Sequence, residues 1–251
     1  MEKIKQLKKK LNKLNLDGYF IPKSDEFFSE YVPNDKDNLK FISNFSGSYG
    51  FALILKNNNY LFVDGRYTTQ AKIESGKLFK IITMPKKMPT DLLKNKKISI
   101  GFDPKLFTEN MLARLFNKAD CKLIPINKNL INNNWKRKKI NNYNKFYKLK
   151  NKEAGQSSES KIRKLTRILN KNKINFQFIS APENVAWLMN IRGLDSEYSP
   201  IPNSYLILDS YNICYLFCNL EKISKKFKNN LGDDVKMINI KNINEFILEI
   251  K

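Results

Sequence analysis

The chain begins with a polar segment in which apolar residues recur every three or four positions, a spacing that places them on one face of an amphipathic helix. Short apolar runs then alternate with helical patterns. Strands are predicted at 19–21, in the two apolar runs of FALILKNNNYLFVDGRY, and at 78–83, 97–102 and 123–126. Helices are predicted at 68–76, from 91, and from the N-cap Thr108 to 118. The polar stretch SDEFFSEYVPNDKDN predicts a long loop.

The second half repeats part of this order. A helix capped by Ser158 or Ser160 precedes the strand FQFIS, a helix that begins near Pro182 and the hairpin SYLILDSYNICYLF. A helix at 221–230, a strand at 235–240 and a helix from 242 follow. The last ten residues, NINEFILEIK, stop inside an apolar helical pattern without a cap, so we expect a second domain that is truncated.

Between the two patterns, composition shifts to Asn, Lys and Ser without a clean period. We therefore predict an α/β fold with a first domain at 1–126, a linker at 127–157 and a second domain at 158–251, each a mixed sheet flanked by helices.

The net charge of +22 raises the question of a nucleic-acid partner. The cations are mostly Lys, spread along the chain and accompanied by Asn and Ile, which share A/T-rich codons, so genome composition accounts for much of the balance. The basic run 136–139 beside Trp135 is the best local case for nucleic-acid binding, because an aromatic ring can stack on a base. A solvated linker is the competing interpretation, and nucleic acid is not the expected partner.

The chain contains no histidine, which removes Ser-His-Asp and Cys-His triads and the usual histidine-containing zinc sites. The three cysteines form no CxxC pair, and their odd number suits a reducing compartment. Cys214 and Cys218 lie in an apolar run and are expected to be buried. No apolar window has signal-peptide or membrane-span length, so we expect a cytoplasmic protein without a membrane partner.

Several local motifs occur in order along the chain. They are GYFIP at 18–22, SEYVP at 29–33, FISNFSGSYG at 41–50 and VDGRY at 63–67, and later GQSS at 155–158 and NVAWLMNIRG at 184–193 with Asp195, Tyr198 and Pro200. The first set resembles the creatinase/aminopeptidase P N-terminal domain. The second resembles the middle domain of three-domain, cytosolic Xaa-Pro aminopeptidases of the M24 metallopeptidase family.

The resemblance implies two related domains that precede a "pita-bread" catalytic domain absent from this sequence. That domain holds two divalent metal ions, usually manganese, through two Asp, one His and two Glu, and it releases an N-terminal residue that precedes proline. We expect no cofactor and no catalytic residue in this chain. The expected partners are its own C-terminal catalytic domain, a second copy in a homodimer, and a peptide with proline at its second position.

Two groups of residues are candidates for a role. In Asp64, Gly65, Arg66 and Tyr67, a charge-assisted pair across the turn with Tyr67 packed beneath predicts a structural latch. Gly193 is predicted to end its helix, so that Arg192, Asp195 and Tyr198 face a substrate or the catalytic domain. An ion pair inside the domain is the alternative for Arg192. Trp187 is predicted to be core.

Two functions follow from these observations. The first is a non-catalytic part of a peptidase that assists substrate access, oligomerisation or support of the catalytic domain. The second is a stand-alone module that binds protein or nucleic acid, in which the positive charge would be used.

Overall fold

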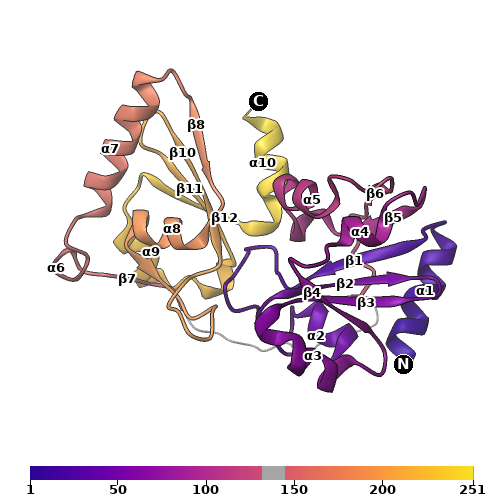
Figure 1. Ribbon diagram of the computed structural model, residues 1–251. Coiled ribbons are helices and arrows are strands. Elements are labelled where there is room, and N and C mark those ends of the chain that lie inside the picture. Colours follow the sequence, from indigo (N-terminus) through magenta and orange to yellow (C-terminus); the bar gives the residue numbers. More distant parts are fainter. Residues whose placement is uncertain (132–144, 251) are drawn as a thin grey trace. The chain divides into compact units, whose positions relative to one another are not determined.

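The computed structural model describes residues 1–131 and 145–250. The chain divides into two compact units, Met1–Lys139 and Ile140–Lys251. Figure 1 shows that each unit has its own sheet and helices, as predicted for two α/β domains. The basic run 136–139 and Trp135 lie outside the described residues.

The first unit is built on a six-stranded mixed sheet in the order β4-β3-β2-β1-β5-β6. β1, β2 and β3 are antiparallel neighbours, whereas β4, β5 and β6 run parallel to the strands beside them. Its strands are β1 (Gly18–Pro22), β2 (Gly50–Leu55), β3 (Asn59–Asp64), β4 (Lys80–Met84), β5 (Ser99–Phe102) and β6 (Lys122–Pro125). Its helices are α1 (Glu2–Lys13), α2 (Asn38–Ser43), η1 (Gly65–Tyr67), α3 (Thr68–Ser75), α4 (Pro89–Leu93), η2 (Pro104–Leu106) and α5 (Glu109–Phe116).

Both faces of this sheet are covered, which explains why β1 is an unbroken apolar run. Alternate strand side chains enter two different cores. Tyr19 and Ile21 pack in a core with α1, α2 and α3, whereas Phe20 packs with α4 and α5 on the opposite face. Figure 1 shows helices on both sides of this sheet.

The second unit contains a four-stranded sheet in the order β12-β11-β10-β8 and a two-stranded sheet of β7 and β9. The larger sheet repeats the order and strand directions of β4-β3-β2-β1. The sequence pattern had predicted only the repeated order of elements along the chain. The strands of the second unit are β7 (Tyr147–Lys148), β8 (Phe176–Ile179), β9 (Ile191–Arg192), β10 (Ser204–Asp209), β11 (Cys214–Cys218) and β12 (Val235–Asn239). The helices of the second unit are α6 (Asn151–Ala154), α7 (Ser158–Lys171), α8 (Pro182–Met189), η4 (Leu220–Lys222), α9 (Lys225–Leu231), η5 (Ile240–Asn242) and α10 (Ile243–Glu249).

One face of the larger sheet packs against α7, α8 and α9 through a single apolar core that includes Cys214 and Cys218. Both cysteines are fully buried and free, as predicted. Burial raises the pKa of each thiol to about 12. On the other face, Phe246 of α10 lies 4.7 Å from Tyr215 and 5.3 Å from Phe217 between ring centroids.

The structure differs from the sequence-based boundaries in several places. Both ends of the predicted linker 127–157 are structured, because Leu130 and Ile131 are buried in the first unit and Phe146 in the second. The predicted loop after β1 ends in the short helix α2, whose N-cap Asp37 accepts a hydrogen bond from the Lys40 N–H. The cap of α7 is Ser157, and neither Ser158 nor Ser160 caps this helix.

Candidate functional site

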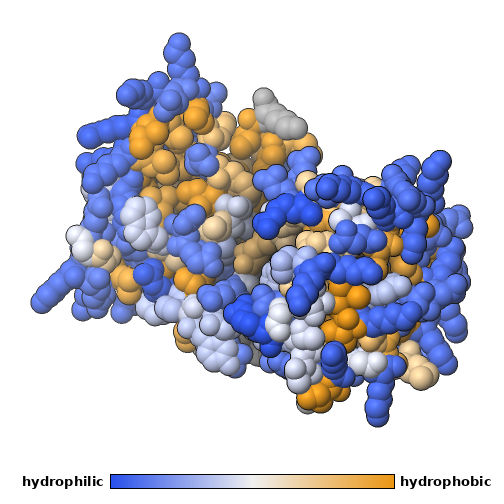
Figure 2. All heavy atoms as spheres, viewed as in Figure 1, coloured by the Kyte–Doolittle hydropathy of each residue, from blue (hydrophilic) through white to orange (hydrophobic). Residues whose placement is uncertain are grey.

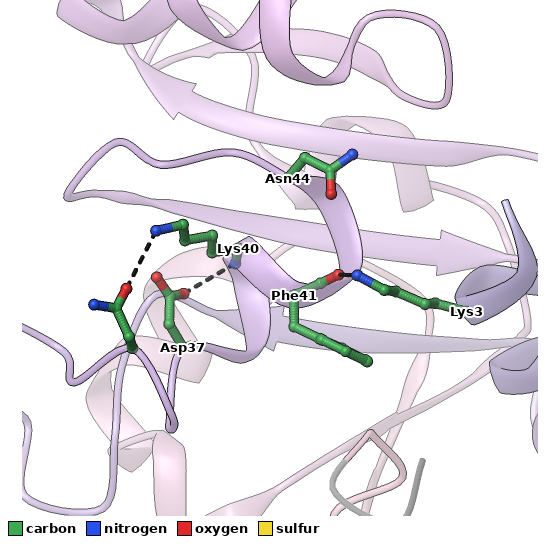
Figure 3. Close-up of a pocket in the computed structure, with 6 residues that line it drawn as sticks. Lys3, Asp37, Lys40, Phe41 and Asn44 are labelled. Carbon is green, nitrogen blue, oxygen red and sulfur yellow. Dashed lines mark hydrogen bonds between the residues drawn. The ribbon is translucent and has the colours of Figure 1, made fainter. Parts of the chain in front are cut away.

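A hollow of about 410 Å³ opens beside α2 in the first unit, and Figure 3 shows the side chains around it. Lys3 Nζ donates to the Phe41 carbonyl oxygen over 2.9 Å, and Lys40 Nζ donates to Asn34 Oδ1 over 3.2 Å. Asp37 is paired with Lys23. Because all three charged side chains that line the hollow are already bonded inside the unit, it is poorly equipped for chemistry.

The DGRY turn is held by the pair that its sequence predicts. Arg66 donates to Asp64 Oδ1 through both its backbone N–H and its Nε, each over 2.9 Å. These hydrogen bonds lower the pKa of Asp64, and the same pair raises the pKa of Arg66. Tyr67 packs edge-on against Phe45, and its hydroxyl lies 2.7 Å from Ser48 Oγ. This geometry fits a latch between the turn and the loop before β2.

The second candidate group centres on the C-terminal end of α8. The helix ends at Met189, four residues before Gly193, because Asn190 adopts the left-handed conformation there (φ 54°). Arg192 then pairs in β9 with Tyr147 of β7. Its Nη1 donates to the carbonyl oxygens of Ala186 and Ile191 over 3.1 and 2.8 Å. Arg192 therefore caps the helix end instead of projecting from a loop.

Lys161, from α7, reaches the same helix end and was not singled out by sequence reasoning. Its Nζ donates to the Trp187 carbonyl oxygen and to Asn190 Oδ1, and lies 4.4 Å from the centroid of the Trp187 ring. Burial lowers the pKa of Lys161, and the nearby Arg192 lowers it further. Nothing in the sequence distinguishes this lysine, because only the packing of α7 on α8 brings it there.

The prediction that Trp187 belongs to the core is wrong, since 61% of this residue is exposed. Val185, Leu188 and Met189 face the core, and Trp187 lies on the outer side of the same helix. The hydrophobicity of the segment indicated a buried face, but it did not show that Trp187, the single aromatic residue of α8, would lie outside that face.

Asp195 and Tyr198 have different environments. The Asp195 side chain is only 4% exposed, forms an ion pair with Lys222, and accepts a hydrogen bond from the Asn203 N–H over 2.7 Å. It therefore holds the loop between β9 and β10 in place. Tyr198 lies in that loop and is 69% exposed. Of the predicted site residues, Arg192 reaches the α8 end, whereas the Asp195 side chain is bonded to Lys222 and the Asn203 N–H.

Two further features bear on chemistry. Asp25 is buried, and its Oδ1 accepts hydrogen bonds from the Phe27 and Ser29 N–H groups, whereas Oδ2 has no hydrogen-bond partner among the described residues. Within residues 1–131 and 145–250, no group of three or more His, Cys, Asp or Glu is placed to hold a metal ion. None of the helices in these residues combines the length and the hydropathy of a membrane span.

The two units match two family models with the same description. Residues 3–133 and residues 137–251 each match a family described as the Creatinase/Prolidase N-terminal domain. The chain belongs to the creatinase/prolidase N-terminal domain family. This confirms the resemblance drawn from the motifs, and the repeated strand order gives its structural basis.

Curated relatives of this family member are Xaa-Pro aminopeptidases. The chain is 30% identical to a probable Xaa-Pro aminopeptidase P of Coprinopsis cinerea, over 97% of this chain and 41% of the relative. It is 32% identical to aminopeptidase P1 of Lotus japonicus, over 87% of this chain and 34% of the relative. The chain thus spans about two fifths of the length of the curated relatives it matches, and it is homologous to their N-terminal part.

A solved structure supports the same assignment. The X-prolyl aminopeptidase of Caenorhabditis elegans, a cytosolic enzyme with a di-nuclear active site, matches with a TM-score of 0.89 and 25% identity. The match covers 98% of this chain and 43% of the C. elegans chain. A di-nuclear site does not fit the described residues of the present chain, because they offer no cluster of metal ligands.

Proposed function

We propose that this chain is the non-catalytic N-terminal region of a metal-dependent Xaa-Pro aminopeptidase. The proposal rests on which part of its relatives this chain matches. The C. cinerea relative matches 97% of this chain but is matched over only 41% of its own length, and both halves here match an N-terminal domain family. The absence of histidine from the sequence agrees with metal binding elsewhere.

In the whole enzyme, a C-terminal domain would bind two divalent metals, manganese by the family resemblance, and release the residue that precedes proline. The two units would support that domain, govern substrate access and contribute to a homodimer in the cytoplasm. The cytosolic C. elegans enzyme supports this location. The DGRY latch and the Asp195–Lys222 pair suit such a scaffold, because both fix loops without leaving a reactive group.

The first experiment assays the purified chain with manganese and a Gly-Pro-type peptide. We expect no release of the N-terminal residue, whereas the product of the full reading frame should release it under the same conditions. Turnover that follows the chain through purification and survives a second preparation would contradict the proposal.

The second experiment sequences the gene beyond the codon for Lys251. We expect an open frame that encodes a domain with Asp, His and Glu ligands. A stop codon directly after Lys251 would contradict the proposal and favour a stand-alone module.

A further inference from the structure

The C-terminal end of α8 gathers two cations without a carboxylate. Lys161 is 5% exposed and Arg192 is half-buried, and both donate to oxygens at the end of the helix. Neither forms an ion pair with any residue in 1–131 or 145–250. Two like charges that are partly removed from water repel each other, and the helix dipole offsets only part of that cost.

The nearby acids are engaged elsewhere or lie apart from this pair. Asp195 is bonded to Lys222, and Glu159 is bonded to Lys148. Glu183 lies one turn before Trp187 on the exposed side of α8 and forms no ion pair with Lys161 or Arg192. An external anion is therefore the group that would neutralise the cluster.

Arg192 keeps the part of its guanidinium group that binds carboxylates best. Its two hydrogen bonds with described residues both use Nη1. The Nε and Nη2 groups, which form the side-on edge of the guanidinium, make no hydrogen bond with a described residue. That edge offers two parallel N–H donors with the spacing of a carboxylate group.

Exposed aromatic rings flank the cations. Trp187 is 61% exposed and lies under Lys161 Nζ, and Tyr147, which is 45% exposed, pairs directly across the β7–β9 ladder from Arg192. Directly opposed residues on neighbouring strands point to the same side of a sheet. Trp, Tyr and Arg are also the residues that contribute most to binding energy in protein interfaces.

We infer that Trp187, Arg192 and Tyr147 form a binding surface for an acidic peptide segment, to which the buried Lys161 adds its charge. In this arrangement, a carboxylate of the segment binds the free edge of Arg192, and an adjacent apolar side chain packs on Trp187. The inference does not depend on the peptidase assignment.

The positive charge of the chain and of this cluster favours an acidic peptide as the partner. A second copy of this chain would also carry a net charge of +22, so a partner surface of opposite sign is favoured. A nucleic acid would require a track of cations along its backbone. This cluster instead has two cations at one helix end, both already bonded to carbonyl or amide oxygens, which suits a single carboxylate.

The test uses the full 251-residue chain with Trp135→Phe, which leaves Trp187 as its only tryptophan. The probe is a blocked peptide with two glutamates between two phenylalanines, and its control replaces both glutamates by glutamine. We expect a saturable change in Trp187 fluorescence with the glutamate peptide and at least tenfold weaker binding of the glutamine peptide, equivalent to about 1.4 kcal/mol.

Matched variants separate this site from general attraction to a basic protein. Arg192→Gln should weaken binding about tenfold, whereas Arg167→Gln, which removes an exposed arginine of α7, should change it less than about twofold. Arg192→Lys keeps the charge but loses the two-donor edge, so it should weaken binding about threefold or more. It also provides the test if Arg192→Gln fails to fold.

Three outcomes would overturn the inference. They are equal weakening by the variants at Arg192 and Arg167, equal binding of the two peptides, and saturation of the fluorescence change by a single-stranded oligonucleotide more tightly than by the glutamate peptide. The last result would assign the surface to nucleic acid.

Discussion

At the scale of single residues, close packing at Gly193 explains why this position in the NVAWLMNIRG motif has no side chain. A Cβ atom there would lie 2.9 Å from the Cβ of Pro202 and 3.1 Å from Cδ1 of Phe146. Neither neighbour can move easily, because Pro202 is cyclic and Phe146 is buried in the core of the second unit.

We therefore expect Gly193→Ala to destabilise the second unit by about 1–3 kcal/mol, as overpacking of a core does. Urea unfolding followed by circular dichroism measures the change. Gly65→Ala is the control, because the nearest atom to its added methyl group lies 3.9 Å away, and it should alter stability by less than about 0.5 kcal/mol. Equal stability of the two variants would refute this account of Gly193.

At the residue scale, two buried acids of the described part of the chain are each paired with a cation. The pairs Lys23–Asp37 and Lys222–Asp195 bury an acid with its cation. On the face shown in Figure 2, hydrophilic side chains are spread over both units and do not gather in one stripe. The surplus of lysine therefore suits a solvated surface. Lys161, which is buried, and Arg192, which is half-buried, are exceptions.

At the scale of elements, the start of α7 shows how several short bonds fix a helix. Ser157 Oγ accepts a hydrogen bond from the Ser160 N–H. The Glu159 carboxylate in the first turn accepts hydrogen bonds from Ser158 and from Lys148 of β7. The pKa of Glu159 falls to about 2, chiefly because its own backbone N–H donates to the carboxylate.

A depressed pKa stabilises the fold above the pKa of the unfolded chain, and that contribution is lost as the pH falls toward the folded value. Glu159→Gln should therefore lower the free energy of unfolding at pH 7 by less than about 1 kcal/mol, since the site is partly exposed to solvent. The difference from the unmodified chain should shrink between pH 5 and pH 2, the lower limit being set by the folded pKa. Thermal unfolding at successive pH values measures it.

Glu197→Gln is the control for this helix start, because Glu197 is an exposed loop acid that should change stability by less than about 0.5 kcal/mol at pH 7. If the free energies of unfolding of Glu159→Gln and the unmodified chain differ by the same amount down to pH 2, the carboxylate charge contributes nothing to stability.

At the scale of the whole molecule, the chain consists of two units with separate cores. The first unit has apolar cores on both faces of its sheet, and the second has one main core under α7, α8 and α9. Because each core is closed by residues of its own unit, each has the elements that an independent fold needs.

We expect fragments 1–139 and 140–251 to fold separately, each with a cooperative urea transition. The slope of unfolding free energy against urea concentration (the m-value) scales with the surface exposed on unfolding. The m-values of the two fragments should therefore add up to the value expected for the surface of the whole chain. Loss of cooperativity in either fragment would show that its core depends on the other unit.

The local pattern determined most of the elements. Strand and helix positions follow from apolar spacing within a few residues, so β1, the hairpin of β2 and β3, α5 and α8 all lie close to their predicted places. The DGRY pair is also local, because its partners are two residues apart. The absence of histidine required no structure at all.

Contacts between distant segments required the tertiary structure. α2 was missed because a helix of six residues is too short to show a clear helical period. Trp187 was misplaced because the sheet, and not the helix, decides which side is covered. The meeting of Lys161 with Arg192 joins α7 to β9 across the end of α8, and no short-range pattern encodes it. The sequence determined the elements and the family, whereas packing decided which charges lie together and which aromatic rings face solvent.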